Sequence, residues 1–134
     1  MSGFRLDRRL EADSIAISRL GLCQLRLMND SRWPWLILVP QRRDAEEIFH
    51  LTPLDQTLLT FETCETARAL KQATGCDKIN VAALGNQVRQ LHVHVVARTM
   101  RDPAWPGPVW GVGNASPYDS VAAERLIADL VDSL

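Results

Sequence analysis

The chain has 134 residues, of which 46% are hydrophobic and 23% charged. This is the size and composition of one globular domain, so we expect a single domain over residues 1–134, and disordered, collagen-like and coiled-coil chains are excluded. Fifteen Lys and Arg residues against 16 Asp and Glu residues give a formal net charge of -1. No global positive field therefore favours a nucleic acid polymer or an anionic membrane as a partner.

The cysteines and the N-terminal sequence indicate the cellular compartment of the protein. Cys23, Cys64 and Cys76 form no Cys-x-x-Cys pair, and an odd, scattered set is a poor disulfide framework. The N-terminus lacks the apolar core of a secretory signal, and the longest apolar run, residues 35–40, is far shorter than the ~20 residues that span a bilayer. We expect a soluble cytoplasmic protein.

Three strands are predicted in the first third of the chain. Residues 14–17 alternate apolar and polar side chains, and residues 23–27 do the same, as half-buried strands do. Residues 35–39 are continuously apolar and end at Pro40. This run predicts a central strand that is covered on both faces.

A long helix follows. Thr52, Pro53 and Asp55 form a helix start with a hydroxyl cap, a proline at the first position and an acid in the first turn. We expect the helix to reach Gly75. Its predicted apolar positions recur at helical spacing: Leu54, Leu58, Phe61 and Cys64.

The last part of the chain adds two strands and a helix. Residues 78–83 and 90–97 read as strands, and the short loop 84–87 predicts that they pair antiparallel. Residues 102–111 hold three prolines and two glycines, which excludes regular structure there. Ser116 and Pro117 are expected to cap a final helix, with Ala123, Leu126, Ile127, Leu130 and Val131 on one side. Strands with segregated helices predict an α+β domain on an antiparallel sheet.

The strand at residues 90–97 carries the chemistry. Because strand side chains alternate, Gln90, His92 and His94 share one face, and the apolar residues between them face the core. Imidazole serves as nucleophile, proton shuttle or metal ligand near neutral pH. A His-x-His strand also presents metal ligands, so a metal-binding protein is one alternative.

The segment Gln90-Leu-His-Val-His-Val-Val96 resembles the histidine triad (HIT) motif, His-φ-His-φ-His-φ-φ with φ apolar. The family pattern is also similar in four other stretches, in the same order along the chain: Leu36–Pro40, Phe49–Asp55, Leu84–Val88 and Trp105–Gly107. The chain is therefore identified as a member of this superfamily, resembling its diadenosine polyphosphate hydrolase branch with a Gln-φ-His-φ-His variant.

The resemblance implies an α+β fold with an antiparallel sheet, one long helix and a C-terminal helix, in a homodimer. It implies an enzyme that cleaves at the α-phosphate of a dinucleoside polyphosphate, or of a nucleoside phosphoramidate or phosphoester, without a cofactor. His92 stands at the family's nucleophile position and would form a nucleotidyl-histidine intermediate. His94 would hydrogen-bond phosphate oxygens, with further phosphate contacts from Asn80, Gly85, Asn86, Gln87 and Val88.

Other residues carry weaker expectations. Asn29 stands near the family's ribose-contacting residue, although an ordinary turn role fits equally. Trp105 and Trp110 either form a lid on the pocket or plug the core. Arg89 and Arg98 contact outer phosphates or are surface cations, and His50 is expected at the surface.

Two departures from the family pattern bear on activity. Gln90 occupies the first histidine position, and Trp35 occupies that of a fourth active-site histidine. Gln90 is able to orient a phosphate or the ring of His92, but an amide cannot carry a proton. The alternatives are an enzyme whose substrate has a good leaving group, or a protein that binds nucleotides without efficient turnover, as a sensor or interaction module.

Overall fold

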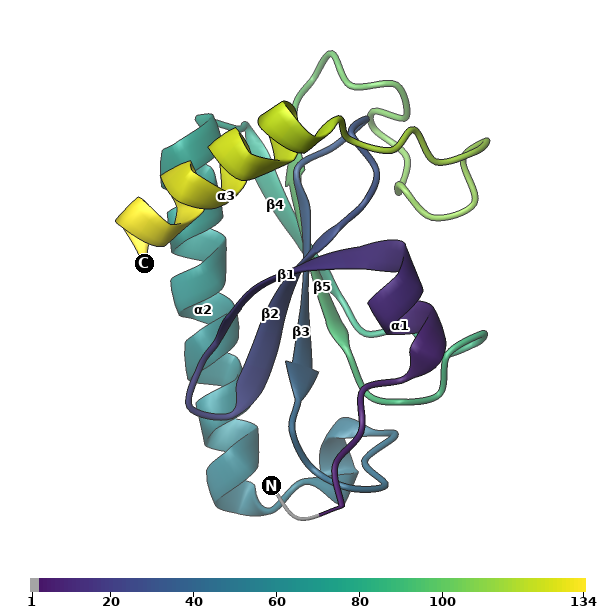
Figure 1. The fold of residues 1–134 in the computed structure, drawn as a ribbon, viewed down its shortest axis with the longest axis vertical. Helices are drawn as coiled ribbons and strands as arrows, with labels where there is room; N and C mark the ends of the chain where they lie inside the picture. The colour runs from purple at the N-terminus through teal and green to yellow at the C-terminus, as the bar shows by residue number, and fades with distance from the viewer. Residues whose placement is uncertain (1–2) are drawn as a thin grey trace.

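In the computed structural model, which describes residues 3–134, five strands form one antiparallel sheet in the order β1-β2-β3-β5-β4 (Figure 1). The strands are β1 (Ser14–Arg19), β2 (Cys23–Met28), β3 (Trp35–Pro40), β4 (Lys78–Ala82) and β5 (Val93–Arg98). The helices are α1 (Arg8–Asp13), the short 3-10 helix η1 (Ile48–His50), α2 (Pro53–Thr74) and α3 (Ser120–Ser133). The predicted α+β fold with an antiparallel sheet, a long helix and a C-terminal helix is confirmed.

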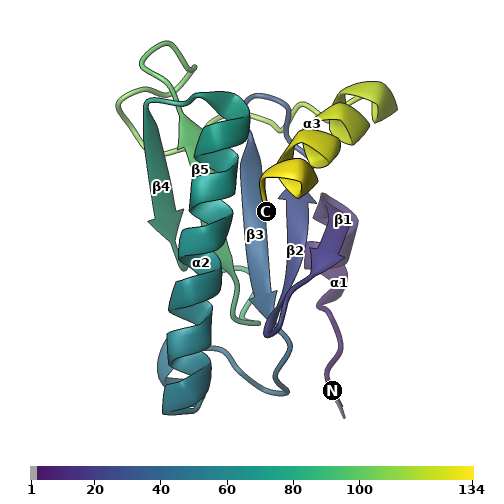
Figure 2. The same cartoon turned by 90° about the vertical axis from the view of Figure 1, so that its left-hand side faces the viewer.

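Strand β3 lies at the centre of the sheet, and all six of its residues are buried. Leu36 and Leu38 face the core under helices α2 and α3, which lie on the same side of the sheet (Figure 2). Trp35, Ile37 and Val39 face the opposite side, which we call the second face. The prediction of a central strand covered on both faces is therefore confirmed.

The ends of helix α2 lie where the sequence predicts them. The side chain of Thr52 accepts a hydrogen bond from the backbone N–H of Asp55, and Gly75 ends the helix in the left-handed conformation, φ 66°. The predicted apolar face of the helix is wrong, because Leu54 and Phe61 are 71% and 61% exposed. The buried positions are instead Asp55, Leu59, Glu62, Thr66, Ala69 and Leu70.

Two carboxylates hold this unexpected face of α2 in the core. Asp55 pairs with the guanidinium of Arg42 at 2.6 Å. The carboxylate of Glu62 accepts hydrogen bonds from the backbone N–H groups of Leu22 and Cys23 at 2.7 and 2.9 Å. Buried carboxylates persist where charge and hydrogen bonds satisfy them, so a pattern based on apolar residues selects the wrong side of this helix.

Strand β5 begins at Val93 rather than at Gln90. The backbone N–H of Leu91 donates to the carbonyl of Ala45, which leads this part of the chain away from β4. The connection between β4 and β5 is therefore longer than the four residues expected, although the two strands do pair antiparallel.

Helix α3 begins later than predicted. Its cap is Asp119, whose side chain accepts from the backbone N–H of Ala122 at 2.8 Å, while Ser116 donates its own backbone N–H to Asp30. Ala123 and Leu130 are buried on this helix as expected, but Val131 is 48% exposed.

The second face of the sheet is covered by helix α1 and by the irregular segment after β5. Helix α1, which was not predicted, is capped by Asp7 and buries Leu10 against β3. The irregular segment 102–112, which has no helix or strand as predicted, covers another part of this face. The three cysteines are free thiols. Within residues 3–134, no helix has both the length and the apolar character needed to cross a membrane.

Candidate active site

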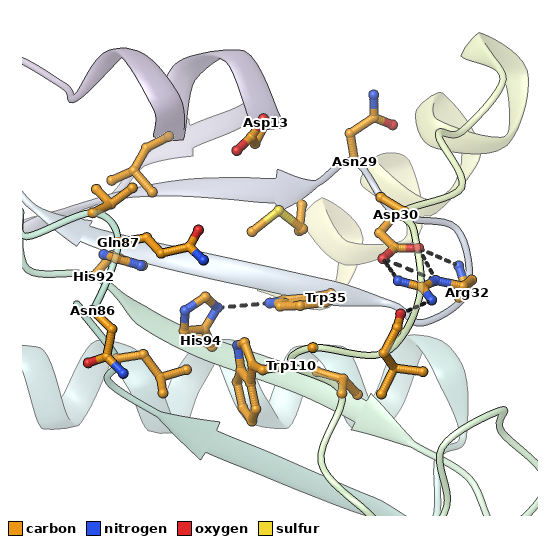
Figure 3. Close-up of a pocket in the computed structure, with 18 of the residues that line it drawn as sticks. Asp13, Asn29, Asp30, Arg32, Trp35, Asn86, Gln87, His92, His94 and Trp110 are labelled. Carbon is orange, nitrogen blue, oxygen red and sulfur yellow. Dashed lines mark hydrogen bonds and ion pairs between the residues drawn. The ribbon is translucent and has the colours of Figure 1, made fainter.

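A cavity of about 670 Å³ opens on the second face of the sheet, within the range of small-molecule sites, roughly 300–1,000 Å³. His92 and His94 form part of its wall, and Figure 3 shows both histidines with the neighbouring polar side chains. The remaining wall comes from Trp35 and from four segments: residues 10–13, residues 28–32, the loop 84–88 and residues 109–117. Side chains distant in the sequence therefore meet in one cavity.

His92 is held by a backbone contact. The residue is 5% exposed, and Nδ1 lies 2.7 Å from the carbonyl oxygen of Gln90. A carbonyl oxygen only accepts, so we assign the ring proton to Nδ1. Nε2 of neutral His92 then carries a lone pair, as a nucleophile requires.

His94 has the opposite tautomer. Its Nδ1 accepts a hydrogen bond from the indole N–H of Trp35 at 2.9 Å, and an indole only donates. The proton of neutral His94 is therefore on Nε2. Burial, reinforced by the neighbouring His92, lowers the pKa of His94 from 6.5 to about 3. His94 is thus a neutral donor across the physiological pH range.

Two tryptophans fix the ring of His94. The ring centroids of Trp35 and Trp110 lie 5.7 and 5.3 Å from that of His94. Trp110 lies edge-to-face against both His94 and Trp35 and lines the cavity. The centroids of His92 and His94 are 4.9 Å apart. This packing restricts the rotation of both imidazoles.

The structure brings the predicted loop residues to the histidines. Gly85, Asn86, Gln87 and Val88 line the same cavity. Figure 3 shows Asn86 and Gln87 beside the two histidines. Asn29 also lines the cavity, and its Oδ1 accepts from the backbone N–H of Tyr118 at 2.9 Å. The amide of Asn29 therefore has a structural contact besides its place in the wall.

Gln90 and Asn80 are not among the cavity-lining residues. The side chain of Gln90 bonds to the backbone of Arg5 and Asp7, and Oδ1 of Asn80 accepts from Arg98 at 2.8 Å. The ring of His92 is thus oriented by the backbone carbonyl of Gln90 and not by its amide, as one of the expectations had it. The phosphate contacts expected of Gln90 and Asn80 stay predictions.

Arg98 is a buried structural cation, which corrects both expectations for it. It is 1% exposed and bonds through Nε to Asp102 at 2.8 Å and through NH2 to the carbonyl of Gly107 at 2.7 Å. The Arg98 guanidinium holds the pKa of Asp102 well below its usual range. Arg98 therefore anchors the irregular segment that continues to Trp110.

Three further residues lie outside the cavity wall. Trp105 is 36% exposed, and its ring centroid lies 5.7 Å from Cζ of Arg98. Arg89 is an exposed cation that pairs with Glu46 at 3.4 Å. His50 is exposed, as predicted. Of the two tryptophans considered as a lid, only Trp110 meets the cavity.

Several residues of the cavity wall were missed by the sequence interpretation. Asp13 at the end of α1 lines the cavity, and so do Asp30 and Arg32, which pair at 2.8 Å. A cap at Asp7 followed by apolar Leu10 was the available signal for α1. The pairing of Trp35 with His94 joins residues 59 positions apart, and no local pattern predicts it.

Among residues 3–134, no group of three or more His, Cys, Asp or Glu side chains is placed to hold a metal ion. Nδ1 of both cavity histidines is already hydrogen-bonded.

The fold is thus a five-stranded antiparallel sheet with helices, which presents two histidines beside a glycine-containing loop. A family model described as "HIT domain" matches residues 9–101. The chain belongs to the HIT domain family, a superfamily of nucleotide-binding hydrolases and transferases.

Solved structures agree with this assignment. A histidine triad protein from Sinorhizobium meliloti 1021 is 61% identical, with a TM-score of 0.98 and coverage of 100% of this chain and 99% of the other. One from Bradyrhizobium japonicum is 44% identical, with a TM-score of 0.96 and coverage of 98% of both chains. One from Marinobacter aquaeolei VT8 is 43% identical, with a TM-score of 0.96 and coverage of 99% and 97%. No significant match was found among curated proteins.

Proposed function

We propose that this protein is a nucleotide hydrolase or transferase that cleaves at the α-phosphate of its substrate through a nucleotidyl-His92 intermediate. The observation that carries the proposal is the pair of opposite tautomers in one cavity. His92 directs a lone pair on Nε2 from a ring whose Nδ1–H is bound, and His94 offers an N–H donor. The two groups match the two needs of phosphoryl transfer, a nucleophile and a donor to the phosphoryl oxygens.

In the first step, Nε2 of His92 attacks the α-phosphorus. A P–N bond forms, the bond to the leaving group breaks, and the leaving group departs with the electron pair. The imidazole becomes cationic, and the carbonyl of Gln90 stabilises this charge by accepting from Nδ1–H. Nε2–H of His94 and the backbone N–H groups of residues 85–88 bind the phosphoryl oxygens.

In the second step, water attacks the same phosphorus and the P–N bond breaks. A P–O bond forms, and the electron pair of the P–N bond returns to Nε2. The products are a nucleoside monophosphate, neutral His92 and one proton from the attacking water, which passes to solvent. Dividing one displacement into two gives the enzyme an easier path, and another acceptor in place of water would give a transferase.

The acid–base groups of the site favour a leaving group that departs as a stable anion. His94 has a pKa of about 3 and is a poor proton donor at neutral pH. Asp30 in the cavity wall is paired with Arg32. We therefore expect dinucleoside polyphosphates, which release a nucleoside polyphosphate, to react faster than phosphoramidates or simple phosphoesters, whose leaving groups need a proton.

A nucleotide-binding protein without efficient turnover is the second candidate. The observation in its favour is that Gln90 and Trp35 occupy two positions where the family pattern has histidine. Either candidate uses a small-molecule nucleotide, and we propose that Asn29, in the wall of the cavity, contacts the nucleoside.

One experiment separates the two candidates. Wild type, His92→Ala and His50→Ala are incubated with diadenosine polyphosphates and adenosine phosphoramidate, and product release is measured. Turnover by wild type and His50→Ala, with a loss of at least about 100-fold in His92→Ala, is expected for a covalent nucleophile. Binding without turnover by wild type would favour the second candidate. Equal turnover by all three proteins would contradict the role of His92.

We also propose a homodimer. Strand β4 forms an outer edge of the sheet, and its Val81 is 51% exposed. An edge strand with an exposed apolar side chain is a template for pairing with another chain. Light scattering should give twice the mass of the 15.0 kDa chain, and a monomer at micromolar concentration would contradict this.

A further inference from the structure

The first part of the described chain forms a wall of the cavity. Leu10, Ala12 and Asp13 line the cavity from helix α1. Phe4 and Leu6 pack against the apolar cluster of the second face. We call residues 4–13 the N-terminal wall. Its position therefore sets the width of the cavity on one side.

The side chain of Gln90, which is distant in the sequence, binds the backbone of this wall. Oε1 of Gln90 accepts a hydrogen bond from the backbone N–H of Asp7 at 2.8 Å. Nε2 of Gln90 donates to the backbone carbonyl of Arg5 at 2.7 Å. The two contacts bind the backbone on either side of Leu6 and span 83 and 85 positions of sequence. The amide of Gln90 therefore binds the wall at two points, and we call this pair of hydrogen bonds the clip.

The chemistry of this clip suits glutamine and not histidine. A carboxamide presents its acceptor oxygen and its donor nitrogen side by side and in similar directions. It therefore matches a backbone N–H and a carbonyl that lie close together. The two nitrogens of an imidazole point in diverging directions, so one ring cannot make both contacts.

Gln90 also connects the wall to the proposed nucleophile. Its side chain binds the wall, and its backbone carbonyl accepts from Nδ1 of His92 at 2.7 Å. Within the wall, the side chain of Asp7 caps α1 by accepting from the backbone N–H of Arg9. The guanidinium of Arg9 reaches the carbonyl of Gln87 in the loop 84–88 at 3.4 Å.

We propose that Gln90 is a positioning residue that holds the N-terminal wall against the cavity, and that it sets nucleotide affinity while taking no part in proton transfer. The inference rests on the proposed function, in that the cavity is taken to bind a nucleotide. The glutamine at this position is then an adaptation to the N-terminal wall. Loss of the clip releases the wall, which weakens binding and leaves the chemical step intact.

The test compares wild type with Gln90→Ala, Gln90→His and the matched control Gln72→Ala, whose side chain is exposed on α2. Three quantities are measured: amide hydrogen exchange at Asp7, affinity for adenosine 5′-monophosphate and guanosine 5′-monophosphate, and kcat and KM for a diadenosine polyphosphate. The first needs no nucleotide and the second needs no turnover. They therefore report on the clip even if His92 proves not to be a nucleophile.

We expect faster exchange at Asp7 in Gln90→Ala, with an increase in Kd and KM of about tenfold from the two lost hydrogen bonds. Gln90→His, which loses at least one of the two, should show smaller changes in the same direction. The kcat should change by less than about threefold, with an unaltered pH profile, and Gln72→Ala should match wild type. Unchanged exchange and affinity would overturn the proposal. A fall in kcat at constant KM, or a shifted pH profile in Gln90→His, would overturn it by assigning Gln90 to the chemistry. If wild type binds no nucleotide, the proposed function fails along with the affinity role, whereas exchange at Asp7 still tests the clip.

Discussion

Trp35 donates its indole N–H to Nδ1 of His94 at 2.9 Å, from the start of strand β3 to the neighbouring strand β5. Because an indole has a donor and no acceptor, this contact is satisfied only while Nδ1 of His94 is unprotonated. Trp35 therefore fixes the tautomer of His94. It does so from a position where the family pattern has a histidine.

Replacing Trp35 by Phe removes this donor and keeps an aromatic ring. The proton of His94 is then no longer held on Nε2. We therefore expect turnover to fall by at least about tenfold and stability to fall by about 1 kcal/mol. Nitrogen chemical shifts of His94 report the tautomer directly. Trp105→Phe, outside the cavity, is the matched control. Unchanged His94 shifts in Trp35→Phe would contradict the assignment.

The lowered pKa of His94 predicts how stability depends on pH. The folded protein keeps His94 neutral to about pH 3, whereas the unfolded chain binds a proton near pH 6.5. The stability that His94 contributes is therefore fully present above pH 6.5 and is lost as the pH falls from 6.5 toward 3. Asp30 and Asp102 also have lowered pKa values, but their effect begins near pH 4, the ordinary range of aspartate.

In the window from about pH 6.5 to 5, above the range in which these aspartates lose their contribution, we expect the lowered pKa of His94 to reduce stability as the pH falls. Urea unfolding of wild type should show stability falling across this window, and His94→Gln should show a shallower slope. A titration of His94 in the folded protein with a midpoint near pH 6.5 would contradict the account.

Arg98→Met tests the anchor of segment 102–107. Removing the guanidinium leaves the carboxylate of Asp102 buried without its partner, so we expect a loss of about 3–5 kcal/mol. The matched control is Arg89→Met, which breaks an exposed pair with Glu46 and should cost less than about 0.5 kcal/mol. Chemical denaturation measures both, and equal losses would refute the structural role of Arg98.

Glu62→Ala tests the buried carboxylate on helix α2. The backbone N–H groups of Leu22 and Cys23 would lose their acceptor, and we expect a loss of about 2–3 kcal/mol. Glu65→Ala on the same helix breaks an exposed pair with Arg68 and should cost at most about 0.5 kcal/mol. The same denaturation assay measures both variants. Unchanged stability in Glu62→Ala would show that these N–H groups find other partners.

The strands and the ends of α2 were predictable because their signals are local. Apolar alternation sets the faces of β2, and a cap, a proline and a glycine limit the long helix. The buried face of α2 was not predictable, because carboxylates occupy it and their partners lie 13 to 40 residues away.

The candidate site was likewise predictable only where the signal is local. His92, His94 and the loop 84–88 were found from a local motif. The roles of Gln90, Arg98 and Trp35 depend on contacts between segments far apart in the chain. A residue type alone does not reveal whether its polar group faces a ligand or another part of the protein.

The most direct test of the central claim is the mass of the intermediate on His92. Wild type is mixed with a diadenosine polyphosphate, quenched in alkali, where phosphoramidate bonds to histidine persist, and digested for mass spectrometry. We predict an adenylyl adduct on the peptide that contains His92, located on that residue by fragmentation and absent from His92→Ala. Steady turnover by wild type with no adduct, or with the adduct on another residue, would contradict the account.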